Sequence, residues 1–165
     1  MPTGFLNVPN IGYLVASFVH ALGMAVWLGG IVALGAIVAP TLFRRLPRHE
    51  AGALFGPMLR IFEKVSLGAA VFAVTGAAAK AFIAEQNVNL WSLLRYVSLF
   101  AMCALLFAAN SLIHPAIRKV QEANPSVSQL PETDPARMRF QMLHKISERL
   151  MMGQLAFGLV VLLFT

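Results

Sequence analysis

The sequence predicts an all-α membrane protein, a bundle of four transmembrane helices with both termini outside. Hydrophobic residues make up 58% of the 165-residue chain and charged residues only 12%, a composition that excludes an ordinary soluble domain. Four apolar segments are long enough to cross the hydrocarbon of a lipid bilayer, which is about 30 Å thick and requires about 20 helical residues. We therefore expect one domain, residues 1–165, embedded in a membrane.

The first apolar segment, residues 11–40, holds a single residue of the Asp, Glu, Lys, Arg and His group, which is His20. No Lys or Arg precedes it, and it is too long for the apolar region of a signal peptide, so we expect a retained helix. The link that follows mixes basic residues with apolar ones such as Leu54 and Met58. This pattern is typical of an interfacial helix that leads into the second span.

The second apolar segment, residues 61–82, is rich in alanine and glycine. Small residues let helices approach closely in lipid, which fits tight packing and association into a homodimer. The third segment, residues 93–113, follows a short link in which Trp91 suits the membrane interface. Cys103 in this segment is the only cysteine of the chain, which excludes an internal disulfide, a thiolate metal cluster and covalent haem attachment.

The fourth apolar segment, residues 149–165, is short by itself. Thr133, Asp134 and Pro135 are typical of an N-cap followed by proline at the first helical position. We therefore expect the last helix to begin at Pro135 and to run for about 45 Å, with its first turns at or above the membrane surface. The loop before it, residues 121–133, contains two prolines and is predicted to be disordered.

Basic residues are gathered on one side of the predicted bundle. Of the 13 Lys and Arg residues, only Lys80 and Arg95 lie on the side of the termini. The positive-inside rule then places both long links in the cytoplasm and both termini outside, as in a multi-pass protein of the inner membrane. Because no basic patch is interleaved with aromatic residues, the net charge of +6 does not indicate a nucleic-acid partner. The other basic residues are Arg44, Arg45, Arg48, Arg60, Lys64, Arg118, Lys119, Arg137, Arg139, Lys145 and Arg149.

Three histidines are candidate ligands for a metal or a haem iron. An ionisable residue within a bilayer is a functional candidate by default, and this applies most to His20. His114 and His144 are predicted near the cytoplasmic interface on antiparallel helices joined by one loop, so the two could bind one iron together. His20 differs from His144 by about 25 Å in depth, which separates it from that pair.

Ordinary structural roles remain open for each of these histidines. His20 could simply bond to a neighbouring helix. His114 could satisfy the last carbonyls of the third helix, and His144 could interact with Glu148 or lipid headgroups. The fourth histidine, His49, lies in a charged loop and is expected to be solvated.

Two blocks of the sequence carry a family resemblance. The first, residues 20–56, includes Trp27 and Pro40, and the second, FQMLHKIS, includes His144. Together they resemble the transmembrane protein 205-like proteins, a family of small integral membrane proteins related in style to the membrane domain of copper-resistance protein D. This resemblance implies copper as an alternative cofactor, and soft thioethers such as that of Met24 suit Cu(I), although methionine also fills gaps in apolar packing.

The spacing of His20, Trp27, Gly29 and Gly30 forms a His-x6-Trp-x-Gly-Gly pattern. This pattern is similar to the first helix of the membrane-type protoporphyrinogen oxidase. That family is associated with haem, and its helix histidine is the suspected ligand. The resemblance implies that His20 is an axial ligand of a non-covalently bound haem b.

The same resemblance implies roles for residues around the haem. Lys80 and Arg95 would pair with the propionates, Trp27 would pack beside the ring or seal the helix interface, and Met24 is an alternative ligand. We therefore expect an integral membrane b-type haem protein with a redox or haem-handling role and an unknown redox partner. The alternatives are a copper-handling protein of the copper-resistance D type and a non-catalytic structural subunit. Whether the chain is an enzyme stays open.

Overall fold

The structure, a computed structural model, describes residues 10–84 and 89–165. Within these residues the chain is helical and contains no strand. Four continuous helical rods are long and apolar enough to cross a membrane, which confirms the predicted all-α class and the four helices of spanning length. The rods are Ile11–Arg45, Arg48–Ala84, Leu90–Ala123 and Pro135–Leu163.

Each rod is longer than the span predicted for it. The second rod, α3 (Arg48–Ala84), has 37 residues and is about 55 Å long at 1.5 Å per residue, well beyond the hydrocarbon thickness of about 30 Å. Its predicted span began only at residue 61, because charged residues precede that point. The polarity of the sequence shows where a helix leaves the lipid. It does not show where the helix ends, because the backbone hydrogen bonds continue beyond that point. The predicted interfacial helix is therefore the first part of α3, which continues through Pro57.

Two rods contain a π-helical turn shortly before a proline. The first rod consists of α1 (Ile11–Val32), η1 (Ala33–Val38) and α2 (Ala39–Arg45). The third consists of α4 (Leu90–Ala108), η2 (Ala109–Ile113) and α5 (His114–Ala123). Pro40 and Pro115 lack an N–H and crowd the carbonyl four residues earlier, and a local π adjustment accommodates this without ending the helix. The expectation that His114 ends the third helix is therefore wrong.

Side-chain caps mark three of the rod starts. The Asn10 side chain accepts from the Gly12 amide, and the Asn89 side chain accepts from the Ser92 amide at 2.8 Å. Asp134 accepts from the Ala136 amide, also at 2.8 Å, at the start of α6 (Pro135–Leu163). The predicted Asp134–Pro135 helix start is thus confirmed, because the carboxylate satisfies amides that have no partner within the helix.

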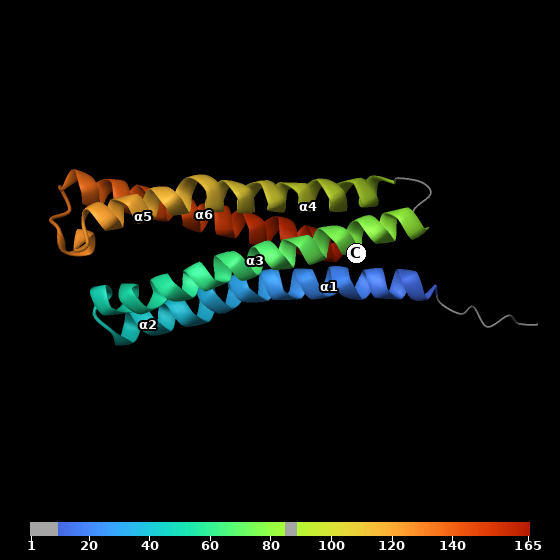
Figure 1. Ribbon diagram of the computed structural model, residues 1–165, viewed down its shortest axis with the longest axis horizontal. Coiled ribbons are helices and arrows are strands. Elements are labelled where there is room, and N and C mark those ends of the chain that lie inside the picture. Colours follow the sequence, from blue (N-terminus) through green and yellow to red (C-terminus); the bar gives the residue numbers. More distant parts are fainter. Residues whose placement is uncertain (1–9, 85–88) are drawn as a thin grey trace, which may run out of the picture.

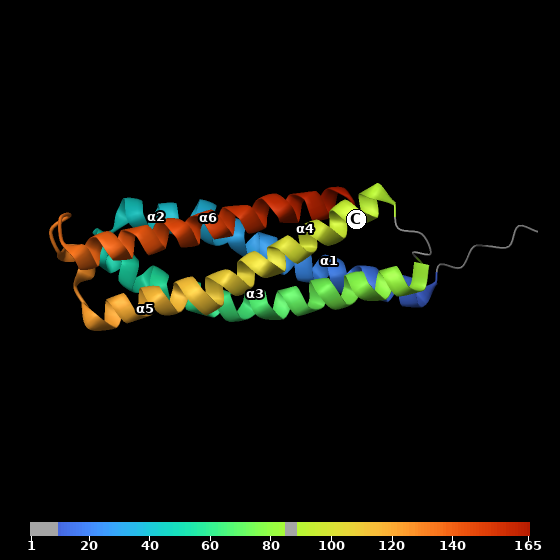
Figure 2. The ribbon, with the colours of Figure 1, turned by 90° about the horizontal axis from the view of Figure 1, so that it is seen from above.

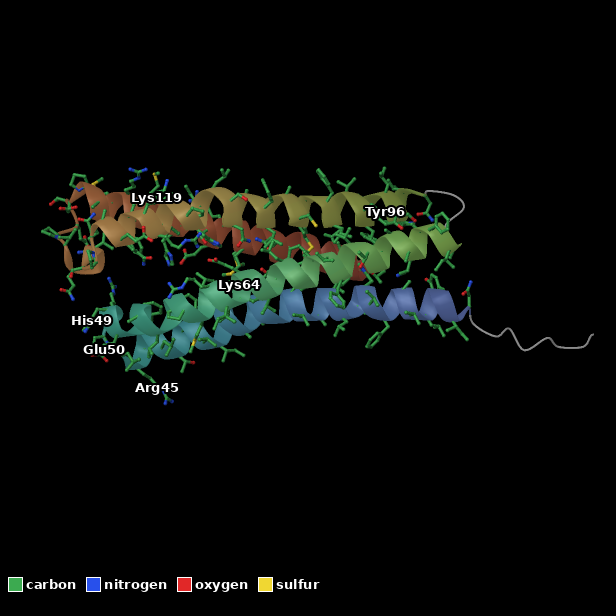
Figure 3. All side chains as sticks on the ribbon, in the orientation of Figure 1. Arg45, His49, Glu50, Lys64, Tyr96 and Lys119 are labelled. Carbon is green, nitrogen blue, oxygen red and sulfur yellow. The ribbon has the colours of Figure 1, made fainter. Side chains whose placement is uncertain are left out.

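The rods form two antiparallel pairs, α1 with α3 and α4 with α6, stacked on one another (Figure 1). The connections at residues 46–47 and 124–134 lie at one end of the bundle, and α1 begins at the opposite end, where the C-terminus also lies (Figures 1 and 2). We call these the loop end and the terminal end. Side chains such as Arg45, His49 and Glu50 extend from the loop end (Figure 3).

Two glycines allow α1 and α3 to touch through their backbones. A Cβ atom added at Gly23 would lie 2.4 Å from the Ala73 amide nitrogen, and one added at Gly76 would lie 2.4 Å from the His20 amide nitrogen. No real Cβ makes such contacts, so only glycine fits at these two positions. The small residues predicted to permit close packing therefore serve the contact within this pair.

The loop over residues 124–134 contains a short helix and packed apolar side chains, whereas residues 121–133 were predicted to be disordered. Val127, in the short 3-10 helix η3 (Val127–Gln129), is buried against Val120 of α5 and Leu143 of α6. The two prolines stop the helix, but they do not prevent the apolar side chains between them from packing. This second small core closes the loop end of the α5–α6 pair.

Candidate functional site

His20 is held inside the bundle at the contact of α1 with α3. Its side chain is 1% exposed, and Nδ1 lies 2.7 Å from the carbonyl oxygen of Ala73. Because a carbonyl can only accept, Nδ1 carries the hydrogen and donates, which leaves the lone pair of the neutral ring on Nε2. Nε2 is buried and has no hydrogen-bond partner within residues 10–84 and 89–165.

This arrangement of His20 is the one that metal-binding histidines use. A hydrogen bond from one ring nitrogen to a backbone carbonyl fixes the tautomer and the ring orientation, and the other nitrogen then presents its lone pair to the metal. A buried polar atom without a partner is rare and calls for an explanation. His20 therefore has the chemistry of a ligand, whether for haem iron or for a soft metal ion.

The two cations predicted on the terminal side are both buried near His20. Lys80 of α3 is 3% exposed and Arg95 of α4 is 7% exposed, and both act electrostatically on the His20 ring. The Lys80 ammonium lies 5.8 Å from the centre of the Tyr13 ring, and Arg95 donates to the Tyr96 hydroxyl at 2.7 Å. Neither cation is without partners. Together they make the terminal half of the bundle interior electropositive.

Trp27 and Met24, predicted beside a cofactor, are fully buried in the main core. The Trp27 indole nitrogen donates to the Gln154 side-chain oxygen at 3.0 Å, which ties α1 to α6. Of the two roles expected for Trp27, the structure provides the sealing of a helix interface. Gln154 was not predicted, although it is an isolated amide in the apolar stretch 150–163, which is itself a signal.

His114 lies in a second polar cluster, nearer the loop end, and both of its ring nitrogens have contacts. Nδ1 lies 2.8 Å from Oε1 of Glu63, at an angle that departs from a straight hydrogen bond. Nε2 lies 3.2 Å from the Ser147 hydroxyl. The other carboxylate oxygen of Glu63 lies 3.5 Å from Arg118. These side chains come from three helices, α3, α5 and α6.

A small polar cavity of about 30 Å³ adjoins this cluster. A water molecule needs roughly 10–15 Å³ by the same measure, so the cavity has room for one. Ser66 uses its hydroxyl hydrogen on the Glu63 carbonyl, and Asn110 donates to the Leu106 carbonyl, which leaves oxygen acceptors for a guest. The polar residues of the lining are Glu63, Ser66, Asn110, His114, Ser147 and Gln154.

The remaining histidines lie on the surface. The His144 side chain is 45% exposed, with Nε2 3.3 Å from Glu148, and its ring stacks on Phe140. His49 is 55% exposed beside Glu50, which agrees with its expected solvation (Figure 3). His114 and His144 therefore have separate partners. Within the described residues no group of three His, Cys, Asp or Glu side chains could hold a metal ion.

Glu63 is the main residue of this cluster that sequence reasoning missed. It is an acidic residue inside the predicted span 61–82, and so carried the same signal that singled out His20. Its partner His114 lies 51 residues away, and helical periodicity cannot predict which faces of two separate helices meet. Ser147 is the last residue of the FQMLHKIS block, and no role was predicted for it for the same reason.

Residues 22–126 match the model of a family described as "Domain of unknown function (DUF4149)". The matched region covers more than half of the chain and includes Met24, Trp27, Glu63 and His114, while His20 lies just before it. No curated protein and no solved structure matches the chain.

Proposed function

We propose that this chain, which belongs to the DUF4149 family, is a membrane protein that binds b-type haem non-covalently through His20. The observation that carries the proposal is the buried Nε2 atom of His20, which has no partner while Nδ1 is fixed on the Ala73 carbonyl. A neutral imidazole held in this way is a suitable axial ligand for haem iron. When bound, the haem would supply one-electron chemistry or would itself be the molecule that is handled.

The charges around His20 support the same cofactor. Haem carries two propionates, and burying these anions requires cations. Lys80 and Arg95 are buried and close enough to act on the His20 ring. We propose that they hold the propionates at the terminal end of the bundle.

We propose a place for this haem from the packing of the helices. The α1–α3 contact beside His20 is closed, because the backbones touch at Gly76 and Gly23. The two helix pairs meet each other less extensively than the helices within each pair do. We therefore propose that the haem lies between the pairs, and that loading it moves α4 and α6 away from α1 and α3.

His114 and His144 are not part of the proposed ligand set. Nδ1 of His114 faces the Glu63 carboxylate and Nε2 lies against the Ser147 hydroxyl, and His144 is half exposed beside Glu148. From the distribution of basic residues we further propose that the loop end faces the cytoplasm and that both termini lie outside the inner membrane. We also propose that the chain is related to the transmembrane protein 205-like proteins and that it forms a homodimer.

An absorption spectrum tests the haem assignment. The detergent-purified protein, loaded with haem b, should show a Soret band that shifts on reduction. His20→Gln should lose this band, because glutamine can still donate to the Ala73 carbonyl but offers no imidazole to the iron. His49→Gln, at an exposed position, is the matched control and should keep it. A full band in both variants would overturn the role of His20.

Copper is a second candidate, favoured by one observation. Met24 lies one turn after His20, and both Met24 and Met102 are fully buried in the same core. Thioether and imidazole groups suit Cu(I). A copper carrier would retain copper in metal analysis without a Soret band, and a structural subunit would retain neither.

A further inference from the structure

The cluster around Glu63 and His114 has features that a merely structural ion pair does not need. It joins a carboxylate, an imidazole and a hydroxyl from three helices, and it opens on the small polar cavity. Among the described residues there are two other His–Glu pairs, His49 with Glu50 and His144 with Glu148, but both are solvated. In contrast, the Glu63 and His114 side chains are only 14% and 11% exposed.

We propose that Glu63 and His114 form an internal proton-exchange site, which binds and releases one proton through water in the adjoining cavity. The proposal is independent of haem binding at His20. The site binds a proton that water delivers, and the proton passes through the Ser147 hydroxyl.

The partners of His114 suit both of its protonation states. When the ring is cationic, both nitrogens donate, Nδ1 toward Glu63 and Nε2 to the Ser147 oxygen. When the ring is neutral with its hydrogen on Nδ1, Nε2 accepts from the Ser147 hydroxyl instead. A hydroxyl can donate or accept by rotation, so Nε2 keeps Ser147 as its partner when the proton is lost. A partner that could only donate would prevent this exchange.

The exchange step balances without a redox partner. The proton on Nε2 passes to the Ser147 oxygen as the Ser147 hydrogen passes to the water, which leaves as hydronium. The pair then changes from a carboxylate–imidazolium of zero net charge to a carboxylate–imidazole with one negative charge.

Charged groups on the packed helices would stabilise that negative state. Arg118 of α5 lies 3.5 Å from the Glu63 carboxylate, and Arg60 of α3 acts on it electrostatically. The contact from α6 is the neutral hydroxyl of Ser147. The two cations that act on the carboxylate therefore come from α3 and α5, the helices that carry Glu63 and His114.

Infrared difference spectroscopy on the detergent-purified, full-length protein tests the proposal. Spectra are compared between about pH 5 and pH 8, the range in which histidine changes charge, in H₂O and in D₂O. We expect a carboxylate band that responds to pH and disappears in both Glu63→Gln and His114→Gln. His49→Gln and His144→Gln, which change the exposed pairs, should keep it.

Ser147→Ala tests the route separately. It removes the hydroxyl but neither member of the pair, so the band should remain while its exchange into D₂O slows. The site is instead a static ion pair if Glu63→Gln leaves the wild-type difference spectrum unaltered. Wild-type exchange rates in Ser147→Ala would overturn the route. If Glu63→Gln does not fold, His114→Gln gives the same decision.

Discussion

The two buried histidines of this bundle, His20 and His114, differ in everything except their residue type. His20 donates to a backbone carbonyl, lies near two cations and keeps one nitrogen unpartnered. His114 faces a carboxylate and a hydroxyl beside a polar cavity. A fixed ring with a free lone pair suits a ligand, whereas a ring with exchangeable partners suits a proton. The neighbours supplied by other helices, rather than the histidine itself, decide which chemistry is available.

Haem retention should separate the two histidines most clearly. His20→Gln removes the buried Nε2 atom, which has no hydrogen-bond partner among the described residues, so we expect complete loss of the Soret band. His114→Gln should keep the band, because neither of its nitrogens is available to iron. The measurement is haem stoichiometry per chain by absorbance. Loss of haem in both variants would mean that the two sites are not independent.

Removal of the carboxylate should affect the His114 site next most strongly. Glu63→Gln leaves Arg118 and His114 facing a neutral amide, and hydrogen bonds to charged groups contribute about 1.5–3 kcal/mol. We expect a loss of unfolding free energy in this range, measured by denaturation in detergent. Glu50→Gln is the matched control, and an exposed pair should contribute under about 1 kcal/mol. Equal losses in the two variants would show that burial does not distinguish the pairs.

A substitution in the α1–α3 contact should disturb the His20 site alone. Gly76→Ala places a methyl group against the His20 backbone, where the contact distance would be 2.4 Å. Overpacking of this kind costs about 1–3 kcal/mol, and the same variant should weaken haem binding but leave the Glu63 infrared band unchanged. Gly68→Ala on the same helix meets nothing within 4 Å and should leave thermal stability unaltered.

The smallest effect is expected at the Trp27–Gln154 hydrogen bond, which ties α1 to α6. Gln154→Leu leaves the buried Trp27 indole N–H without its acceptor, which costs about 1–3 kcal/mol before the gain from the apolar leucine is counted. A net loss near the lower end of this range should appear in thermal unfolding. Gln141→Leu, an exposed position on the same helix, is the control. An unchanged melting temperature would show that Trp27 finds another acceptor.

The fold was more predictable from the sequence than the sites were. Apolar length gave the four helices, and the Asp134–Pro135 cap and the gathering of basic residues at the loop end were both correct. The loop-end limits of the first three rods were not predicted, because prolines and charges interrupt a polarity pattern without ending a membrane helix.

The candidate sites depended on information that one helix does not contain. The burial of His20 follows from its apolar surroundings in sequence. Its bond to Ala73 depends on the distance to which Gly23 and Gly76 let the backbones approach. The pairing of His114 with Glu63 depends on the relative rotation of two rods, and side-chain spacing along either rod leaves that rotation undetermined.

The π-helical segment η2 (Ala109–Ile113) sets the rotational phase of everything that follows it in its rod. Each residue of an α-helix advances about 100° around the axis, so the extra residue of a π turn re-aims α5 relative to α4. This lets α4 direct Arg95 toward the His20 half of the interior while α5 directs His114 toward Glu63. If η2 became regular α-helix with no residue removed, His114 would turn by about 100° away from the carboxylate. A one-residue deletion within η2 would remove the extra residue and leave His114 directed toward Glu63. In relatives of this chain, a one-residue gap at this position should therefore be compatible with the His114–Glu63 pair.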